Sequence, residues 1–233
     1  VSSAEPIDGS TRMLWAECAA VGMPRAVVLT KLDHARSDYA ATLAACQEAF
    51  GANVLPLYLP VVDSAGATTG LIGMLGGRLF DYGGGTRQES DASPDDADRL
   101  EAARGELIEG IIEESEDEGL MDRYLGGEEI EQKVLIDDLE QAVAKGSFHP
   151  VIPVCATTGL GTAELLEIVT SAFPSPIEHP MPEVTSIDGK PRSRISCDPA
   201  GPLVAEIVKT TTDAYVGRIS LVRVLSGTLR PDQ

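Results

Sequence analysis

The sequence predicts an α/β domain that is followed by a segment of antiparallel β-structure. Two short apolar runs, residues 26–29 and 150–156, are typical of buried parallel strands, because each ends in a polar turn and is followed by a helical pattern. Residues 203–229, in contrast, have an all-β character, with apolar residues that alternate with polar ones. The middle of the chain interrupts the α/β pattern with acidic, mostly helical sequence.

The α/β pattern begins with a helix predicted over residues 10–21, which Gly22 and Pro24 end. After the first apolar strand, residues 37–49 form a second predicted helix. In sheets built from such alternation, ligands bind beyond the carboxyl ends of the strands. The last helix of this part is expected at residues 162–172.

Residues 53–145 are predicted to consist of five pieces in chain order. We expect an extended stretch at 53–59, a bent strand or hairpin at 70–79, a glycine-rich loop at 83–94, helical structure over 95–125 and an amphipathic helix over 129–145.

Seven prolines between residues 174 and 202 predict a linker, and hairpin turns are expected near 212–217 and 226–227. The predicted domain organisation has three parts and a linker. They are an α/β part (1–59 and 148–173), an acidic insert (60–147), a linker (174–202) and a β segment (203–233).

Charge is concentrated in one segment. The chain has 18 basic and 37 acidic side chains, a net charge of −19, and residues 89–145 alone carry 5 basic and 20 acidic ones, a net charge of −15. Phosphate-rich surfaces attract the opposite charge, so we expect neither DNA nor a membrane as partner.

The cysteines and histidines give no support for a metal site. The four cysteines are widely spaced and form no Cys-x-x-Cys pair, which argues against zinc and disulfides and favours the reducing cytoplasm. The three histidines are scattered along the chain. The given sequence does not start with the basic and then apolar pattern of a signal peptide, and it contains no apolar run of transmembrane length.

Two short polar sequences follow the two apolar strands: Thr30-Lys31-Leu32-Asp33 and Cys155-Ala156-Thr157. Taken alone, Asp33 is as well explained as a cap of the next helix. Together, the sequences suit guanine, whose N1–H and 2-amino group are two adjacent donors for one carboxylate. The stem of Lys31 can cover the ring, and the backbone amide of Ala156 can donate to guanine O6. Adenine presents an acceptor where Asp33 needs a donor.

These sequences resemble the guanine-specificity loops of translational GTPases, and the order of segments resembles elongation factor G. Residues 26–33 match its Asn-Lys-x-Asp strand and loop, 124–129 a stretch of its inserted subdomain, 154–176 its Ser-Ala loop and last helix, and 203–230 the first strands of its second domain. The resemblance implies a partial P-loop GTPase-type three-layer sheet with an acidic α+β insert, then the start of an antiparallel β-barrel. It also implies GTP or GDP binding, and Thr30, Lys31, Asp33, Cys155, Ala156 and Thr157 as the binding residues.

Two positions depart from the family pattern. Thr30 replaces the Asn, whose longer amide side chain offers more hydrogen-bonding groups. We therefore expect either a lower affinity for guanine or a chain that belongs to a divergent branch of the family. Cys155 replaces the Ser and is a weaker hydrogen-bonding group, although the Ala156 contact is made by the backbone.

The phosphate-binding signature Gly-x-x-x-x-Gly-Lys-[Ser/Thr] does not occur in this sequence. We therefore expect an internal fragment that carries the base-recognition half of the site. Its parent would bind Mg²⁺ and hydrolyse GTP, whereas the fragment alone would neither hydrolyse GTP nor bind GDP with micromolar affinity.

The acidic insert has two explanations. Its run Glu113–Glu118 serves as a solvated helix face, or the insert docks a basic partner. The resemblance implies the ribosome as partner, with the stalk protein's C-terminal domain on the insert. The expected contacts are Glu106, Glu109, Glu113, Glu116 and Glu118. The basic cluster at residues 190–194 is expected to be linker, and the chain a monomer.

Three functions remain open at this point. The first is a part of an elongation-factor-G-like GTPase that couples GTP hydrolysis to ribosomal translocation. The second is a divergent paralogue with a role in ribosome protection or recycling, which Thr30 keeps open. The third is a non-enzymatic interaction module that acts through the acidic insert.

Overall fold

The computed structural model describes residues 1–178, 181–191 and 195–231. It divides into two compact units, Val1–Phe173 and Pro174–Gln233, and each is described by itself. Among the described residues, no helix is both long enough and apolar enough to span a membrane.

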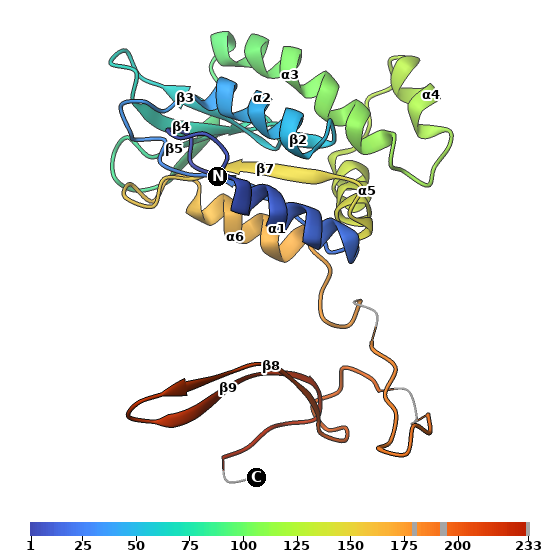
Figure 1. The fold of residues 1–233 in the computed structure, drawn as a ribbon. Helices are drawn as coiled ribbons and strands as arrows, with labels where there is room; N and C mark the ends of the chain where they lie inside the picture. The colour runs from blue at the N-terminus through green and yellow to red at the C-terminus, as the bar shows by residue number, and fades with distance from the viewer. Residues whose placement is uncertain (179–180, 192–194, 232–233) are drawn as a thin grey trace. The chain divides into compact units, whose positions relative to one another are not determined.

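A three-stranded parallel sheet lies at the centre of the first unit (Figure 1). Its strands are β1 (Val27–Leu29), β2 (Val54–Pro56) and β7 (His149–Pro153), in the order β1-β7-β2. The strands are short and apolar, and β7 is buried along its whole length because strands flank it on both edges. The predicted parallel sheet is confirmed.

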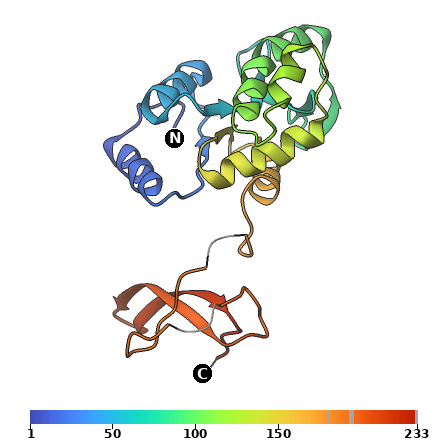
Figure 2. The same ribbon diagram turned by 90° about the vertical axis from the view of Figure 1, so that its right-hand side faces the viewer.

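Helices cover both faces of this sheet. Helices α1 (Gly9–Ala20) and α2 (Tyr39–Phe50) lie on one side of the sheet in Figure 2, and α6 (Thr162–Ser171) lies on the other. The side chains of Asp8 and Asp38 cap α1 and α2 by accepting hydrogen bonds from backbone amides in the first turns. The result is three layers, with successive strand residues facing opposite cores.

The core under α1 and α2 contains one histidine. Trp15 stacks on Phe50 with ring centroids 4.4 Å apart, and its edge meets the ring of His149 at 4.8 Å. Burial lowers the pKa of His149 to about 4, with the nearby Arg25 charge as the second cause. His149 is therefore neutral at pH 7 and serves as a packing residue of this core.

A second, antiparallel sheet follows in the first unit, with strands β3 (Tyr58–Val62), β4 (Thr68–Gly73), β5 (Arg78–Asp81) and β6 (Gln88–Asp91). The hairpin expected at 70–79 is confirmed as β4 and β5. The loop expected at 83–94 is wrong in part, because β6 lies within it. All four residues of β6 are exposed and polar, so no apolar alternation marks the strand.

Three helices complete the first unit: α3 (Pro94–Ile112), α4 (Leu120–Leu125) and α5 (Gln132–Lys145). The continuous helical structure expected over 95–125 is wrong, because residues 113–119 form turns between α3 and α4. Backbone and side-chain bonds local to this segment replace the helical ladder, such as the Asp117 carboxylate accepting from the Gly119 amide at 3.0 Å. Helix α5 ends at Gly146, whose φ of 72° is left-handed.

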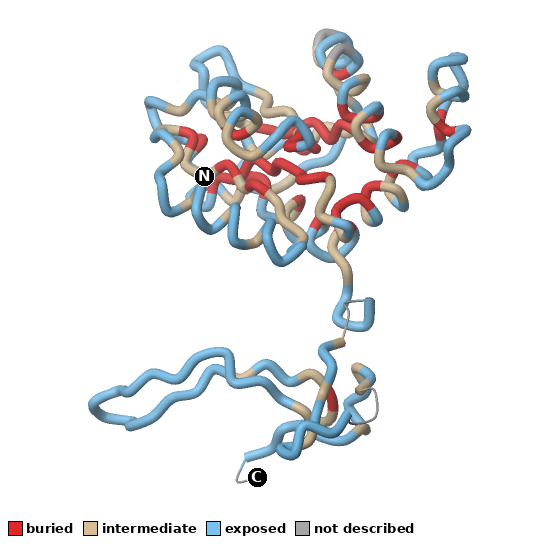
Figure 3. The backbone as a smooth tube through the Cα atoms, turned by 45° about the vertical axis from the view of Figure 1, so that its right-hand side comes forward, coloured by how far each residue is buried: buried red, intermediate tan, exposed pale blue. Residues whose placement is uncertain are grey.

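The second unit contains a β-hairpin of β8 (Val204–Asp213) and β9 (Gly217–Ser226). The Asp213 carboxylate closes its turn by accepting from the amides of Tyr215 and Val216 at 2.8 and 2.9 Å. Both strands are exposed along most of their length, as the pale blue tube in Figure 3 shows. Of the basic cluster at 190–194, residues 192–194 lie outside the described residues.

Candidate functional site

Two polar loops meet at the carboxyl edge of the parallel sheet. Residues 30–33 follow β1 and residues 154–161 follow β7, and these strands are neighbours with Leu29 opposite Pro153. The Val154 amide continues the ladder by donating to the Leu29 carbonyl at 2.7 Å. The two predicted motifs, 124 residues apart in sequence, are therefore brought together.

A hydrogen bond joins the two loops through their side chains. The Thr157 hydroxyl donates to Asp33 Oδ2 at 2.7 Å, and the Cys155 sulfur lies 3.0 Å from the same hydroxyl oxygen. The bond from Thr157 is the largest cause that lowers the pKa of Asp33, and hydrogen bonding of the Cys155 side chain to the same carboxylate is the second. Asp33 is exposed as well as ionised, so its carboxylate is available to donors of a ligand.

Lys31 lies in an unusual backbone conformation. Its φ is 61°, the left-handed region that non-glycine residues rarely occupy, and it is the one such residue in the described part of the chain. The next side chain, Leu32, is only 6% exposed and anchors the loop in the core. The turn therefore leaves Lys31 and Asp33 exposed on either side of a buried residue. The Lys31 ammonium forms an ion pair with Glu5 at 2.8 Å.

Thr30 is held by the N-terminal segment. Its hydroxyl donates to the Val1 carbonyl at 3.2 Å, and its carbonyl accepts from the Ser3 amide at 2.9 Å and the Ser3 hydroxyl at 2.8 Å. The Ser3 oxygen also lies 2.7 Å from the Ser37 oxygen. Because its single hydroxyl proton is donated to the Val1 carbonyl, Thr30 holds the loop against the N-terminal segment.

The loop after β7 presents Ala156 to solvent. Its backbone amide has no hydrogen-bond partner among the residues that the structure describes. Two left-handed glycines, Gly159 (φ 78°) and Gly161 (φ 76°), turn the chain back so that the Leu160 carbonyl accepts from the Cys155 amide at 2.8 Å. The amide of Ala156 is thus left for a ligand's acceptor.

Sequence reasoning missed two residues of the site, Ser3 and Glu5. Ser3 is 4% exposed and supports Thr30, whereas Glu5 is exposed and pairs with Lys31. No local pattern marks Ser3, since its role depends on a parallel bridge between Ser2 and Thr30. The charge of Glu5, opposite to that of Lys31, was the only available signal.

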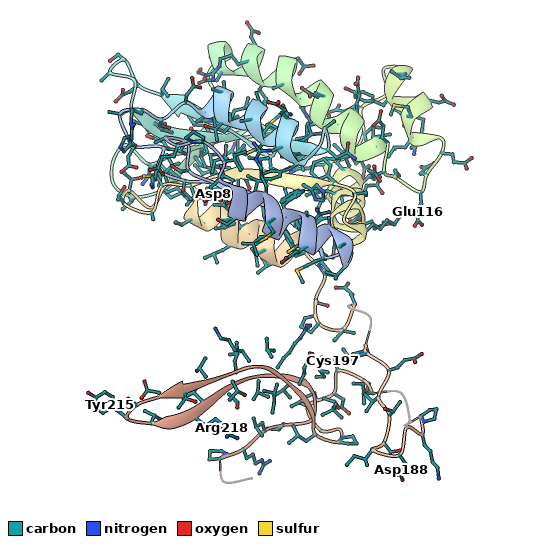
Figure 4. The ribbon with its side chains drawn as sticks, viewed as in Figure 1. Asp8, Glu116, Asp188, Cys197, Tyr215 and Arg218 are labelled. Carbon is teal, nitrogen blue, oxygen red and sulfur yellow. The ribbon has the colours of Figure 1, made fainter. Side chains whose placement is uncertain are left out.

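The five glutamates predicted to bind a partner are all exposed, but they do not share one helix. Glu106 and Glu109 lie on α3, and Glu113 is its C-terminal cap residue. Glu116 and Glu118 lie in the following turns, so the interpretation of Glu113–Glu118 as a helix face is wrong. Glu116 pairs with Lys145 at 2.9 Å, which lowers its pKa, and it lies at the outer edge of the unit in Figure 4.

The residues at this edge fit a guanine base: an ionised carboxylate, an unpartnered amide and a lysine stem lie on two adjacent loops. Among the described residues, no group of three or more His, Cys, Asp or Glu side chains could hold a metal ion.

Comparisons with known proteins agree with this geometry. The model of the elongation factor Tu GTP binding domain matches residues 1–175. Proteins named "Elongation factor G-like protein" from two Mycobacterium tuberculosis strains, CDC 1551 / Oshkosh and H37Rv, are each 60% identical over 232 residues, which is all of this chain and 32% of theirs.

A crystal structure of a Thermus thermophilus protein matches the whole chain and 32% of its own, with a TM-score of 0.78 and 31% identity. This chain thus spans about a third of the length of the relatives that it matches. The chain belongs to the family of the elongation factor Tu GTP-binding domain, and within it to the translational GTPases that resemble elongation factor G.

Proposed function

We propose that this chain supplies the guanine-recognition half of the GTP site in an elongation-factor-G-like GTPase. The observation that carries the proposal is the meeting of the Asp33 loop and the Ala156 loop at one edge of the sheet, joined by the Thr157–Asp33 bond. The Asp33 carboxylate, which can accept from guanine N1–H and the 2-amino group, then lies beside the Ala156 amide, which can donate to O6. Lys31 is the residue proposed to cover the ring and approach the ribose.

The ion pair between Lys31 and Glu5 is compatible with this proposed role of Lys31. Its ammonium contacts Glu5, and both side chains are about half exposed, so the pair is weak and can be given up when a base arrives. Thr30 is proposed to hold the loop and not to contact guanine N7, because its hydroxyl already donates to the Val1 carbonyl.

Asp33→Asn tests the assignment in the whole protein that carries this segment. An amide can donate where the carboxylate only accepts, so the variant should lose GDP affinity and gain affinity for xanthosine diphosphate, whose C2 oxygen is an acceptor. We expect each affinity to change by about tenfold, from the loss of one to two charge-assisted bonds to GDP and the gain of one hydrogen bond to xanthosine diphosphate. Displacement of a fluorescent nucleotide measures both constants.

Asp38→Asn is the matched control for this substitution. Asp38 is exposed and caps α2 by accepting from the Ala41 amide, a role that Asn fills equally well. Its nucleotide preference should stay that of the wild type. An Asp33→Asn protein that still prefers GDP by the original factor would remove Asp33 from the base site.

For the whole protein we propose a cytoplasmic GTPase that works on the ribosome and couples GTP hydrolysis to translocation. The family membership and the name shared by the two mycobacterial relatives support this interpretation. The experiment is ribosome-dependent GTP hydrolysis measured alongside mRNA–tRNA movement. Hydrolysis without movement would favour a paralogue with a role in ribosome protection or recycling, in keeping with Thr30 at the Asn position.

We also propose that the acidic insert meets a basic face of the ribosomal stalk protein. Glu106, Glu109 and Glu113 are exposed at spacings of three and four, so they share one face at the end of α3. Because Glu116 is already paired with Lys145, this trio is the best target for charge reversal.

Reversing Glu106, Glu109 and Glu113 to Lys together should slow association with the stalk protein severalfold and flatten its dependence on salt, because steering by opposite charge is lost. Stopped-flow association at several ionic strengths measures both. Reversal of Glu17, Glu48 and Glu178, exposed acidic residues outside the insert, is the control with the same change in net charge. Equal rates for the two triple variants would exclude a specific acidic contact on α3.

A further inference from the structure

We propose that Thr157 fixes the orientation of the Asp33 carboxylate and so sets the preference for guanine over bases that lack the 2-amino group. The inference rests on the proposed function of Asp33 and assigns Thr157 as a positioning residue for it. Its hydroxyl joins the two loops directly, at 2.7 Å from Asp33 Oδ2.

The direction of the hydrogen bond between Thr157 and Asp33 follows from the available protons. The ionised Asp33 has none, so the single hydroxyl proton of Thr157 goes to Oδ2. The Cys155 sulfur lies 3.0 Å from the Thr157 oxygen, and the Cys155 side chain is the second cause of the lowered Asp33 pKa. The three side chains form a cluster that begins just after β7 with Cys155, which is 3% exposed, and ends at the exposed carboxylate of Asp33.

This arrangement gives Thr157 a task that the residue at position 155 performs poorly. A thiol is a weak donor, whereas a hydroxyl bond to a carboxylate is charge-assisted and strong. The Thr157 bond uses one lone pair of Oδ2, and the carboxylate keeps free acceptor positions on both oxygens. The plane of the Asp33 carboxylate is therefore fixed, while its oxygens can still accept hydrogen bonds from two donors of one ligand.

Orientation matters because guanine needs both oxygens of Asp33 in the plane of the base. A carboxylate that rotates freely still meets one donor, N1–H, with either oxygen. Only a carboxylate held in the plane meets N1–H and the 2-amino group together. Hypoxanthine has N1–H but no 2-amino group, so inosine diphosphate gains little from this orientation.

The test compares GDP with inosine diphosphate in the whole protein. In Thr157→Val, which keeps the branched shape and removes the hydroxyl, we expect the ratio of the two affinities to fall by about fivefold or more, the effect of one hydrogen bond. Thr157→Ser should keep the wild-type ratio within about twofold. A ratio that is unchanged in Thr157→Val overturns the inference.

Thr158→Val is the matched control within the same loop. The Thr158 hydroxyl donates to the Cys155 carbonyl at 3.4 Å and does not contact Asp33, so its removal should leave the ratio unchanged. A fall in Thr158→Val equal to that in Thr157→Val would mean that loop stability, and not the orientation of Asp33, sets the ratio. That result also overturns the inference.

A second measurement needs no nucleotide and separates this inference from the proposed function. Carboxyl NMR of Asp33 in this chain should show its pKa rise in Thr157→Val, because the largest cause of the lowered pKa is gone, and remain unchanged in Thr158→Val. An unchanged pKa in Thr157→Val rejects the contact itself. If the pKa rises but Asp33→Asn leaves nucleotide preference unaltered, the contact stands and the guanine assignment of Asp33 falls.

Discussion

Replacing Gly161 by alanine is expected to lower the free energy of unfolding of the first unit by at least about 3 kcal/mol. A Cβ atom at this position would lie 2.1 Å from the Pro153 carbonyl oxygen and 3.1 Å from its carbon. Both are backbone atoms of the buried strand β7, so neither can move without displacing the sheet. The φ of 76° adds the ordinary cost of a left-handed alanine, about 1 kcal/mol.

Gly159 provides the control for this prediction. It lies two residues earlier in the same loop with nearly the same φ, 78°, but nothing lies within 4 Å of an added Cβ. Gly159→Ala should therefore cost only about 1 kcal/mol, the backbone contribution alone. Trp15, the single tryptophan, stacks in the core of the first unit and reports its unfolding by urea. Similar losses in the two variants would contradict the steric explanation.

The same loop shows how far local sequence can predict this protein. The apolar runs before Thr30 and Cys155 predicted two parallel strands, and the rule that ligands bind at carboxyl ends predicted that their loops meet. Both predictions depend on patterns within a few residues. The contact of Lys31 with Glu5 and the support of Thr30 by Ser3 depend on how a distant segment pairs with β1, which no local pattern records.

The elements that were predicted wrongly lack an apolar signal. Strand β6 is paired along one edge and fully exposed, so its four polar residues look like a loop. The helix expected over 95–125 breaks after Ile112 although acidic residues continue, because charge density does not reveal where local turns replace the helical ladder. The apolar residues of β7 reveal a buried strand in the sequence. An exposed polar strand cannot be distinguished from a loop by this signal, nor an exposed turn from a helix.

A buried carboxylate on α6 is the second feature with a large expected effect. The Glu164 side chain is 0% exposed and accepts hydrogen bonds from Tyr82 Oη at 2.6 Å and from Arg87 Nε at 2.8 Å. Tyr82 and Arg87 flank the glycine turn between β5 and β6, and the Arg87 guanidinium lies 4.3 Å from the centre of the Phe80 ring. One carboxylate on α6 therefore holds the end of the antiparallel sheet.

Glu164→Ala should lower the free energy of unfolding by about 3–5 kcal/mol, because it leaves a cavity, an unpaired Tyr82 hydroxyl and a partly buried charge on Arg87. Glu167 supplies the matched comparison, since it approaches the same guanidinium at 3.5 Å but its side chain is 57% exposed. Glu167→Ala should cost less than about 1 kcal/mol. Urea unfolding followed at Trp15 measures both variants.

Hydrogen exchange distinguishes how Glu164 acts. If the carboxylate joins α6 to the antiparallel sheet, Glu164→Ala should speed exchange at the amides of β5 and β6 as well as at the start of α6. Helix α6 begins directly after Gly161, so faster exchange should extend into the loop that carries Cys155 and Ala156. Faster exchange confined to α6 would contradict the junction, and Glu164 would then act only within its own helix. Exchange that reaches the Asp33 loop as well as the Ala156 loop would show that the fold of the insert supports the proposed guanine site.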